Sequence, residues 1–370
     1  TEATLEGLTA YPSLGQTPQP VDYAFIAIPA GRVPGALRAG SGRVRFAQVM
    51  SSGFGPDDGG PGSARALLDA ATAAGIRLLG PNCMGTYSPR GRTSFIDVGE
   101  PEAGAVGILS QSGGLTIDIL RRGTFRGLRF SGVVSLGNCL DIGPNELLEH
   151  FLADPGTRVI GAYVEQIRDG QRFFRQLRKA GAVKPVVLLK GGRSTQGQRA
   201  AASHTGSLAS NDRVWDALAK QTGSILVDDL AQFVDTLVAL QSIAPSDTPP
   251  SNRVVLFGNG GGASVLAADA LARQGLDVAP LNAQTTAALA GLGLPAGASL
   301  DNPIDVPANL LQRESGGLAR RILSILGTVE VPRAIIMHLN LPVILGYSHI
   351  DMLGDLLDAA LQVRKSVLDE

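Results

Sequence analysis

The feature that most constrains the fold of this chain is a unit of apolar strand, small-residue turn and helix that occurs several times. Ala105–Leu109 has the composition of a buried strand, Ser110–Gly114 forms its turn, and Leu115–Arg122 has a helical pattern. The same order returns between Arg253 and Gln274. Repeated units of this kind indicate an α/β protein built on parallel sheets. The 47 glycines agree with this class, because strand–helix turns use small residues.

The length and two biased segments predict several domains. At 370 residues the chain is long enough for more than one hydrophobic core. Ala244–Asn252, which reads APSDTPPSN, has the composition of a linker, and a softer boundary lies within Pro89–Ala105. We therefore predict three domains, over residues 1–97, 98–246 and 247–370.

The first domain contains three loops that follow predicted strands. The predicted strands are Val21–Ile28, Phe46–Met50 and Ile76–Leu79, with a helix over Ala64–Ala74. Pro29, Ser52–Phe54 and Asn82 follow the three strands, and ligands of parallel sheets bind at the carboxyl ends of strands. For any one of these loops taken alone, ordinary turn chemistry is the better explanation.

This first domain has an unusual beginning. A complete mononucleotide-binding half opens with a strand and a glycine-rich turn, and neither precedes Val21. Gly31–Gly42 is also short and interrupted by glycine where a crossover helix is expected. We therefore expect the domain to be N-terminally incomplete or atypical.

The middle domain brings a carboxylate and a histidine to strand ends. Predicted strands cover Ser131–Leu136, Arg158–Val164 and Val186–Lys190, the last of which is expected to close the sheet. Glu165 follows the second strand, and His204 lies in the loop after the third, KGGRSTQGQRAAASHTGSLA. A carboxylate that accepts one imidazole N–H leaves the other ring nitrogen as a nucleophile. The alternative is that both side chains are simply solvated.

Two small-residue turns predict anion sites at helix N-termini. Ser110, Ser112 and Gly113 precede one helix, and Gly260, Gly261 and Gly262 precede another. Unpaired N–H groups and the helix dipole favour an anion at such positions, so two helices from separate domains can hold one anion between them. A serine N-cap and close helix packing by glycine explain the same residues without a ligand.

Composition excludes several classes of partner. The net charge is −1 without a long basic run, which argues against nucleic acid, and no apolar stretch approaches a membrane span. Cys83 and Cys139 lie far apart and have no metal-binding spacing, so we expect no metal in this chain. The first residues lack the features of a signal peptide, and we expect a cytoplasmic protein.

The motifs, taken in order, resemble those of the NDP-forming acyl-CoA synthetases. SQSGG, YVEQIRDG, GGRS with ASHTGSLA, GNGGG and NPIDV are similar to the ADP-forming acetyl-CoA synthetase type of the succinyl-CoA synthetase superfamily. IAIPA, SSGF and GPNCMG extend the similarity into the first domain. The resemblance implies a Rossmann-like CoA-binding domain followed by two flavodoxin-like ligase domains.

The resemblance also implies roles for individual residues. His204 is the residue that becomes phosphorylated, and Glu165 orients its ring. The turns at Ser110–Gly114 and Gly260–Gly262 hold the phosphoryl group. The residues that contact CoA are Pro29, Ser52, Gly53, Phe54 and Asn82.

The implied reaction interconverts acyl-CoA, phosphate and ADP with carboxylic acid, CoA and ATP. ATP or ADP and Mg²⁺ belong to an ATP-grasp site outside this chain, supplied by a separate subunit or a fused region. The implied partners are therefore CoA, an acyl-CoA or carboxylic acid and an ATP-grasp subunit, in an oligomeric assembly. The sequence does not identify the acyl group.

Two other functions compete with this interpretation. One is a non-catalytic, CoA-binding regulatory module, such as the synthetase-like part of a protein acyltransferase. Such modules can lose the histidine, whereas this chain retains both His204 and Glu165. A dinucleotide-dependent dehydrogenase would need a GxGxxG turn with an acidic residue about 20 positions later, which this chain lacks.

Overall fold

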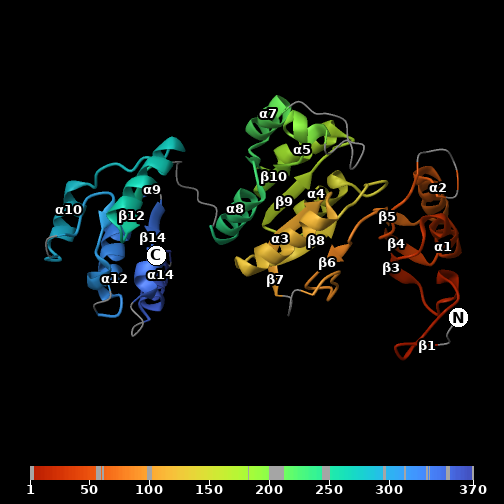
Figure 1. Cartoon of the computed structure of the whole chain (residues 1–370), viewed down its shortest axis with the longest axis horizontal. Coiled ribbons are helices and arrows are strands. Elements are labelled where there is room, and N and C mark those ends of the chain that lie inside the picture. Colours follow the sequence, from red (N-terminus) through yellow and green to blue (C-terminus); the bar gives the residue numbers. More distant parts are fainter. Residues whose placement is uncertain are drawn as a thin grey trace. The chain divides into compact units, whose positions relative to one another are not determined.

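A computed structural model gives the fold of two compact units, Thr1–Pro245 and Ser246–Glu370, which are described separately (Figure 1). The structure describes residues 4–55, 60, 62–97, 102–181, 183–199, 212–243, 251–294, 297–311, 314–330, 332, 334–346 and 351–368.

The first unit begins with a three-stranded parallel sheet of order β3-β4-β5. Its elements are β3 (Val21–Ile26), β4 (Val44–Val49), β5 (Arg77–Leu79), α1 (Val33–Ala39) and α2 (Ala64–Ala74), after a short hairpin of β1 (Thr4–Leu5) and β2 (Leu8–Thr9). Helix α1 lies where the sequence shows no clear crossover helix. Pro34 in its first turn sets the backbone for a helix, and Val33 and Leu37 bury one apolar face.

The second sheet has six strands in the order β11-β10-β9-β7-β8-β6. These are β6 (Thr86–Tyr87), β7 (Ala103–Ser110), β8 (Phe130–Ser135), β9 (Val159–Val164), β10 (Val186–Lys190) and β11 (Ile225–Val227). All neighbours are parallel except β6 and β8. The prediction that Val186–Lys190 closes the sheet is wrong, because Leu188 pairs with Leu226 of β11. β11 is too short to show a strand pattern in the sequence.

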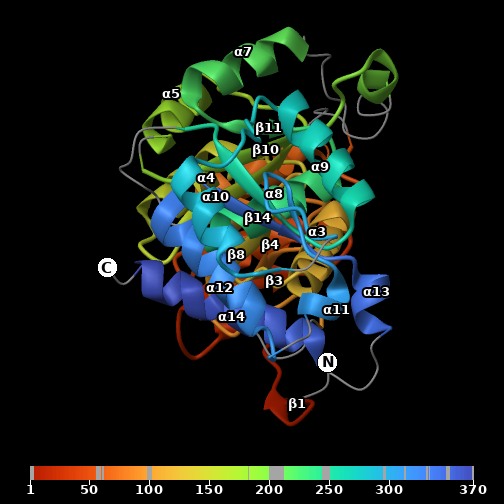
Figure 2. The ribbon, with the colours of Figure 1, turned by 90° about the vertical axis from the view of Figure 1, so that its left-hand side faces the viewer.

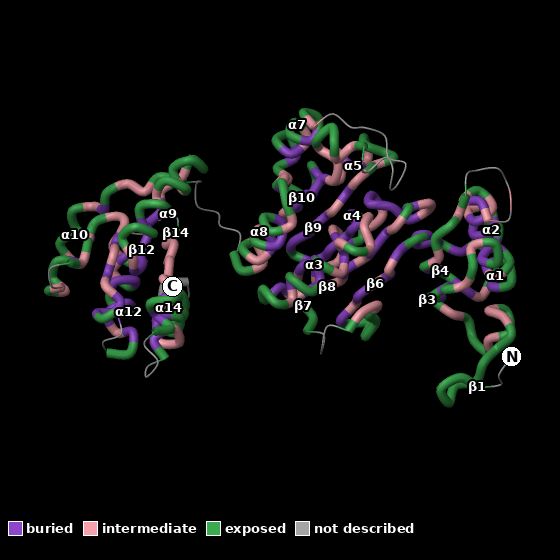
Figure 3. Tube along the Cα trace, in the orientation of Figure 1, coloured by how far each residue is buried: buried purple, intermediate pink, exposed green. Residues whose placement is uncertain are grey.

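Helices cover both faces of this sheet. One face packs against α3 (Gly113–Phe125) and α8 (Leu230–Ser242), and the other against α4 (Pro144–Ala153), α5 (Gly170–Ala180) and α7 (Asp212–Thr222). Figure 3 shows the central strands buried, and every residue of β10 is buried. A parallel sheet that is covered on both faces requires such continuous apolar strands.

Two glycines in the central strands make room for aromatic rings of the covering helices. A Cβ atom on Gly107 would lie 2.5 Å from Phe151 of α4. A Cβ atom on Gly161, in the neighbouring strand, would lie 2.8 Å from Phe233 of α8. The rings therefore contact the sheet backbone on opposite faces, which brings the helices close to the strands.

The second unit is a parallel sheet of order β13-β12-β14. Its elements are β12 (Val254–Gly258), β13 (Ile304–Asp305), β14 (Ala334–His338), α9 (Gly261–Arg273), α10 (Ala283–Ala290), α11 (Ala308–Leu311), α12 (Gly317–Ile325), α13 (Leu341–Leu345) and α14 (Met352–Leu368). Helices α10, α12 and α14 build its core, whereas Ser264 is the one buried residue of α9. Figure 2 shows α10 and α12 on one side of β14 and α9 on the other.

Among the described residues, no helix is long and apolar enough to cross a bilayer. Within the same residues, no group of three or more His, Cys, Asp or Glu side chains is arranged to hold a metal ion.

Both cysteines are free and belong to the core of the six-stranded domain. Cys83 is 2% exposed and Cys139 is 5% exposed. Burial raises the pKa of the Cys83 thiol to about 12, and burial raises that of Cys139 to about 11. The neutral thiol is therefore the form of both side chains near neutral pH.

We expect Gly107→Ala to destabilise the six-stranded domain by about 1–3 kcal/mol, because the new methyl group collides with the Phe151 ring. Urea unfolding followed by the fluorescence of Trp215 measures this domain. Gly170→Ala is the matched control, since a Cβ atom there meets nothing within 4 Å. Equal midpoints for the two variants would contradict the packing argument.

We expect both thiols to react slowly in the folded chain. At pH 8 a thiol of pKa about 12 is about 0.01% thiolate, and one of pKa about 11 is about 0.1%, and the thiolate is the reactive form. Below the pKa, the thiolate fraction rises about tenfold per pH unit, and the rate of the thiol reaction rises with it. Because both pKa values are raised, this dependence continues well above pH 8. Titration with an aromatic disulfide at pH 8, before and after unfolding, measures this. Rapid reaction of the native chain would contradict the assigned burial.

Candidate functional site

The candidate site lies at the carboxyl edge of the six-stranded sheet, where three neighbouring strands end. Ser110 of β7 pairs with Tyr163 of β9, and Lys190 of β10 pairs with Val164 of β9. The loops that follow these strands therefore begin side by side. Glu165 is the first residue after β9 and stands between the other two loops.

Among the described residues, only one of the two carboxylate oxygens of Glu165 has a hydrogen-bond donor. Its Oε1 accepts a hydrogen bond of 3.1 Å from the Tyr163 hydroxyl, while Oε2 is buried and has no partner among the described residues. Gly191 permits this arrangement, because a Cβ atom there would lie 2.5 Å from the Tyr163 oxygen. Burial raises the pKa of Tyr163, and the neighbouring Glu165 carboxylate raises it further, so the hydroxyl stays a donor. A buried carboxylate oxygen without a donor is costly, and Oε2 is therefore placed to receive one.

Gln111 fixes the backbone on which Glu165 stands, a role that sequence reasoning missed. Its Oε1 accepts from the backbone N–H groups of Glu165 at 2.5 Å and Gln166 at 3.0 Å, and its Nε2 donates to Gln166 O at 3.0 Å. The side chain thus joins the turn after β7 to the end of β9. The sequence signal for this role is the glutamine within SQSGG, because a primary amide at the end of a strand can donate to one backbone group and accept from another.

At the start of α3, two backbone amides have no acceptor among the described residues. Ser110 is fully buried and its hydroxyl donates to Ser112 O at 3.0 Å, so we expect Ser110 to shape the turn rather than to contact an anion through its side chain. Ser112 is the N-cap and accepts from Leu115 N at 3.3 Å. No described residue accepts a hydrogen bond from the amides of Gly113 and Gly114.

The GGRS segment is anchored by one arginine. Arg193 forms ion pairs with Asp212, with Asp216 at 3.0 Å and with Asp228 at 2.8 Å. Its hydrogen bond with Asp212 is the main cause that lowers the pKa of that carboxyl. Arg193 therefore joins the loop after β10 to the start of α7. His204 itself lies outside the described residues.

The turn before α9, in the second unit, has a different construction. Gly260 has a φ of +120° and donates its N–H to Asp305 Oδ1 at 2.7 Å. The Ser264 hydroxyl, in the first turn of α9, lies 2.7 Å from His338 Nε2. Among the described residues, the amides of Gly261 and Gly262 have no acceptor. That this turn and the α3 turn share one anion stays a prediction, since they belong to different units.

The loops predicted to contact CoA follow three adjacent parallel strands. Pro29 follows β3, Ser52 and Gly53 follow β4, and Asn82 follows β5. All four are exposed, and Asn82 has a φ of +57°. Phe54 is half-buried and packs against the core of this domain. The predicted residues therefore lie along one edge of one sheet.

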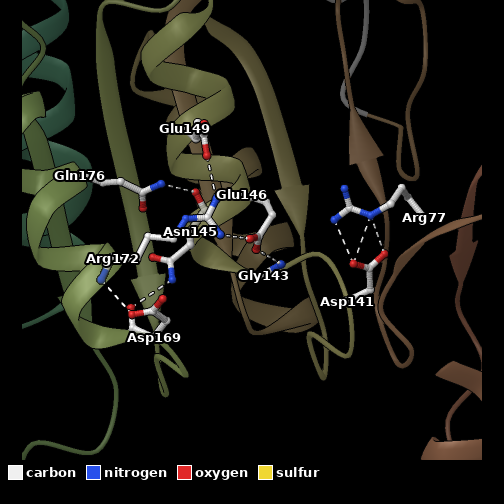
Figure 4. Close-up of polar contacts among 9 residues, drawn as sticks. All are labelled: Arg77, Asp141, Gly143, Asn145, Glu146, Glu149, Asp169, Arg172 and Gln176. Carbon is white, nitrogen blue, oxygen red and sulfur yellow. Dashed lines mark hydrogen bonds and ion pairs between the residues drawn. The ribbon is translucent and has the colours of Figure 1, made fainter. Parts of the chain in front are cut away.

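A second group of polar contacts joins this sheet to loops of the six-stranded domain, and Figure 4 shows one of them, between Arg77 and Asp141. The Asp141 carboxylate accepts from Arg77 at 2.8 Å and from the backbone N–H of Leu78 at 2.8 Å. Asn138 N donates to Pro81 O at 2.9 Å, and Asn82 Nδ2 donates to Asn138 Oδ1 at 3.4 Å. Sequence reasoning did not assign Asp141, because nothing in GNCLD shows which strand it will meet.

Comparisons with known proteins agree with these motifs. A family model described as the CoA binding domain matches residues 1–89, and one described as the succinyl-CoA ligase like flavodoxin domain matches residues 103–240. The chain is 33% identical over 310 residues to subunit alpha of acetate–CoA ligase (ADP-forming) II from Pyrococcus furiosus, which covers 83% of this chain and 67% of that protein. It is 37% identical over 269 residues to subunit alpha of enzyme I from the same organism, with 72% and 58% covered.

A solved structure shares the fold. It is a dinucleotide forming acetyl-coenzyme A synthetase 1 of Ca. Korarchaeum cryptofilum in complex with phosphate and ADP. The TM-score is 0.82 at 28% identity, over 98% of this chain and 77% of that one. The chain spans about three fifths to two thirds of the two curated relatives above. It belongs to the ADP-forming acyl-CoA synthetases, as a chain of the alpha-subunit type with a CoA-binding domain and a succinyl-CoA ligase flavodoxin-like domain.

Proposed function

We propose that this chain, together with an ATP-grasp subunit or region, interconverts acyl-CoA, phosphate and ADP with a carboxylic acid, CoA and ATP. Phosphate attacks the thioester carbonyl and CoA leaves as the thiol, which gives an acyl phosphate. His204 then takes the phosphoryl group and releases the carboxylic acid. ADP, bound with Mg²⁺ at the ATP-grasp site outside this chain, receives that group from His204. The relatives named as acetate–CoA ligases support the reaction class.

The proposal rests on one carboxylate oxygen of Glu165, Oε2, which is buried and has no hydrogen-bond donor among the described residues. Tyr163 and Gln111 hold this carboxylate and its backbone, yet Oε2 has no donor among the described residues. An imidazole N–H is the partner that a phosphohistidine mechanism requires there, because it fixes the tautomer and directs the other nitrogen to phosphorus. The amides of Gly113 and Gly114, at the start of α3, have no acceptor among the described residues and supply donors for phosphoryl oxygens.

CoA is proposed to bind along the carboxyl edge of β3, β4 and β5. The exposed loops at Pro29, Ser52–Gly53 and Asn82 lie next to one another there. The contact between Asn82 and Asn138 leads from this edge to the ligase loops. CoA that is bound along this edge therefore extends its thiol end toward Gln111 and Glu165. Phe54 contributes a half-buried ring to the same loop.

We infer that the second unit is a second flavodoxin-like ligase domain. Its parallel strands and the glycine turn before α9 repeat the β7–α3 arrangement. Within the part of the chain that the structure describes, the amides of Gly261 and Gly262 have no acceptor, which supports a role for α9 as the other phosphoryl-binding helix. The two free, buried cysteines are consistent with the cytoplasmic location that we propose.

Incubation with ATP, Mg²⁺ and an ATP-grasp subunit is expected to add one phosphoryl group to His204, as a mass increase that acid removes. His204→Ala abolishes the adduct, because the nucleophile is gone. Glu165→Gln slows formation of the adduct by about 100-fold, since a neutral amide does not stabilise the oriented, charged imidazole ring as the carboxylate does. His150→Ala, on the exposed end of α4, is the control and forms the adduct normally. An unmodified wild-type chain that still binds CoA would favour the regulatory module instead.

The Ser264–His338 hydrogen bond is expected to position the N-terminus of α9. This helix has no buried apolar residue, so its first turn depends on that bond and on Asp305. Ser264→Ala and His338→Ala should each slow phosphorylation of His204 by about tenfold, and the double variant should be no slower, because paired residues act as one unit. Phosphorylation rates of the four proteins measure this. A double variant whose rate falls by the product of the two single effects would contradict this coupling.

A further inference from the structure

A cavity of about 660 Å³ lies between α5 and α7, and Glu165 is the one side chain of its lining that the steps proposed above use. Its lining is mainly apolar and includes Phe173, Phe174, Trp215 and Leu218. Three charged residues line it as well: Glu165 and Lys190 at the strand ends, and the exposed Arg213 on α7. The volume is typical of small-molecule sites, which combine apolar walls with a few placed polar groups.

Lys190 is the polar group that is built into this cavity. The residue is 7% exposed, and its ammonium lies 5.5 Å from the centre of the Trp215 ring. Gly191 O is the acceptor that the described residues give to Nζ. An ammonium has three donors, and burying one is costly unless its charge and donors are matched. Burial is the main cause that lowers the pKa of Lys190, which is consistent with incomplete compensation.

The two ends of the cavity differ in chemistry. Lys190 pairs with Val164 in the sheet, so it lies beside Glu165 at the strand ends where the reaction is proposed to occur. The aromatic residues come from the covering helices instead, and Phe173 and Trp215 form an edge-to-face pair with ring centres 6.4 Å apart. A ligand with one oxygen-bearing end and an apolar body matches this division.

We propose that this cavity binds the acyl part of the substrate, with its carbonyl or carboxylate oxygen on Lys190 and an apolar body between α5 and α7. The proposal rests on the reaction given under Proposed function and adds the substrate class. A void of about 150 Å³ already holds a benzene molecule, so an acetyl group leaves most of this cavity empty. The structure therefore assigns aryl-substituted or similarly bulky carboxylic acids to it.

Trp215 is the one tryptophan of the chain, so its fluorescence reports on this cavity directly. We expect the full chain to show a saturable change with 3-phenylpropionate and an affinity for acetate that is at least about tenfold weaker. Lys190→Met should weaken 3-phenylpropionate binding by about tenfold or more, because a charge-assisted hydrogen bond is lost.

Two variants on α7 separate filling of the cavity from general effects. Ala217 lines the cavity, whereas Lys220 is exposed on the same helix and does not. Ala217→Phe should abolish or strongly weaken the response, and Lys220→Phe should leave it unchanged, with folding checked by circular dichroism. Equal responses to acetate and 3-phenylpropionate would overturn the proposal. So would an unaltered response in both Lys190→Met and Ala217→Phe.

Phosphorylation of His204 from ATP separates this proposal from the proposed function, because that half-reaction needs no acyl group. If His204 is phosphorylated normally but 3-phenylpropionate does not bind selectively, the cavity assignment is wrong and the proposed function stands. If 3-phenylpropionate binds selectively but no phosphoryl adduct forms, the synthetase mechanism is wrong and the cavity remains a carboxylic acid site.

Discussion

The carboxylate of Glu165 is the group on which the candidate site depends. Its position comes from three constraints that the fold supplies together: the Tyr163 hydroxyl, the amide of Gln111 and the absence of a side chain at Gly191. None of these contacts uses Oε2, which is buried. Among the described residues this buried oxygen has no donor, which is costly, and an N–H group that donates to it removes that cost.

The parallel sheet explains why so many functional loops are neighbours. Parallel strands that are covered by helices on both faces place all their carboxyl ends at one edge. Close approach of the helices depends on Gly107 and Gly161, whose missing side chains admit the rings of Phe151 and Phe233. The packing of the core thus fixes the spacing of the strand ends at which Gln111, Glu165 and Lys190 lie.

Much of the fold followed from local patterns, whereas contacts between distant loops did not. The strand over Val186–Lys190 and the helix over Ala64–Ala74 were predicted to the residue, because both are long enough to show apolar patterning. β11 was missed because three residues carry no period. Gln111 and Asp141 were missed for another reason. Their partners are 54 and 63 residues away, and no local pattern records which loops a topology brings together.

The two helix starts that are proposed to hold the phosphoryl group are stabilised in different ways. Helix α3 buries apolar residues against its sheet, so its N-terminus is fixed by the core and capped by Ser112. Helix α9 buries only Ser264, and Asp305 and His338 anchor it from the two strands beside β12. A helix that is anchored at one end by polar contacts reorients at lower energetic cost than one embedded in a core. The first turn of α9 is therefore the more adjustable of the two anion sites, and its geometry depends on the charge and hydrogen bonding of strand-end side chains.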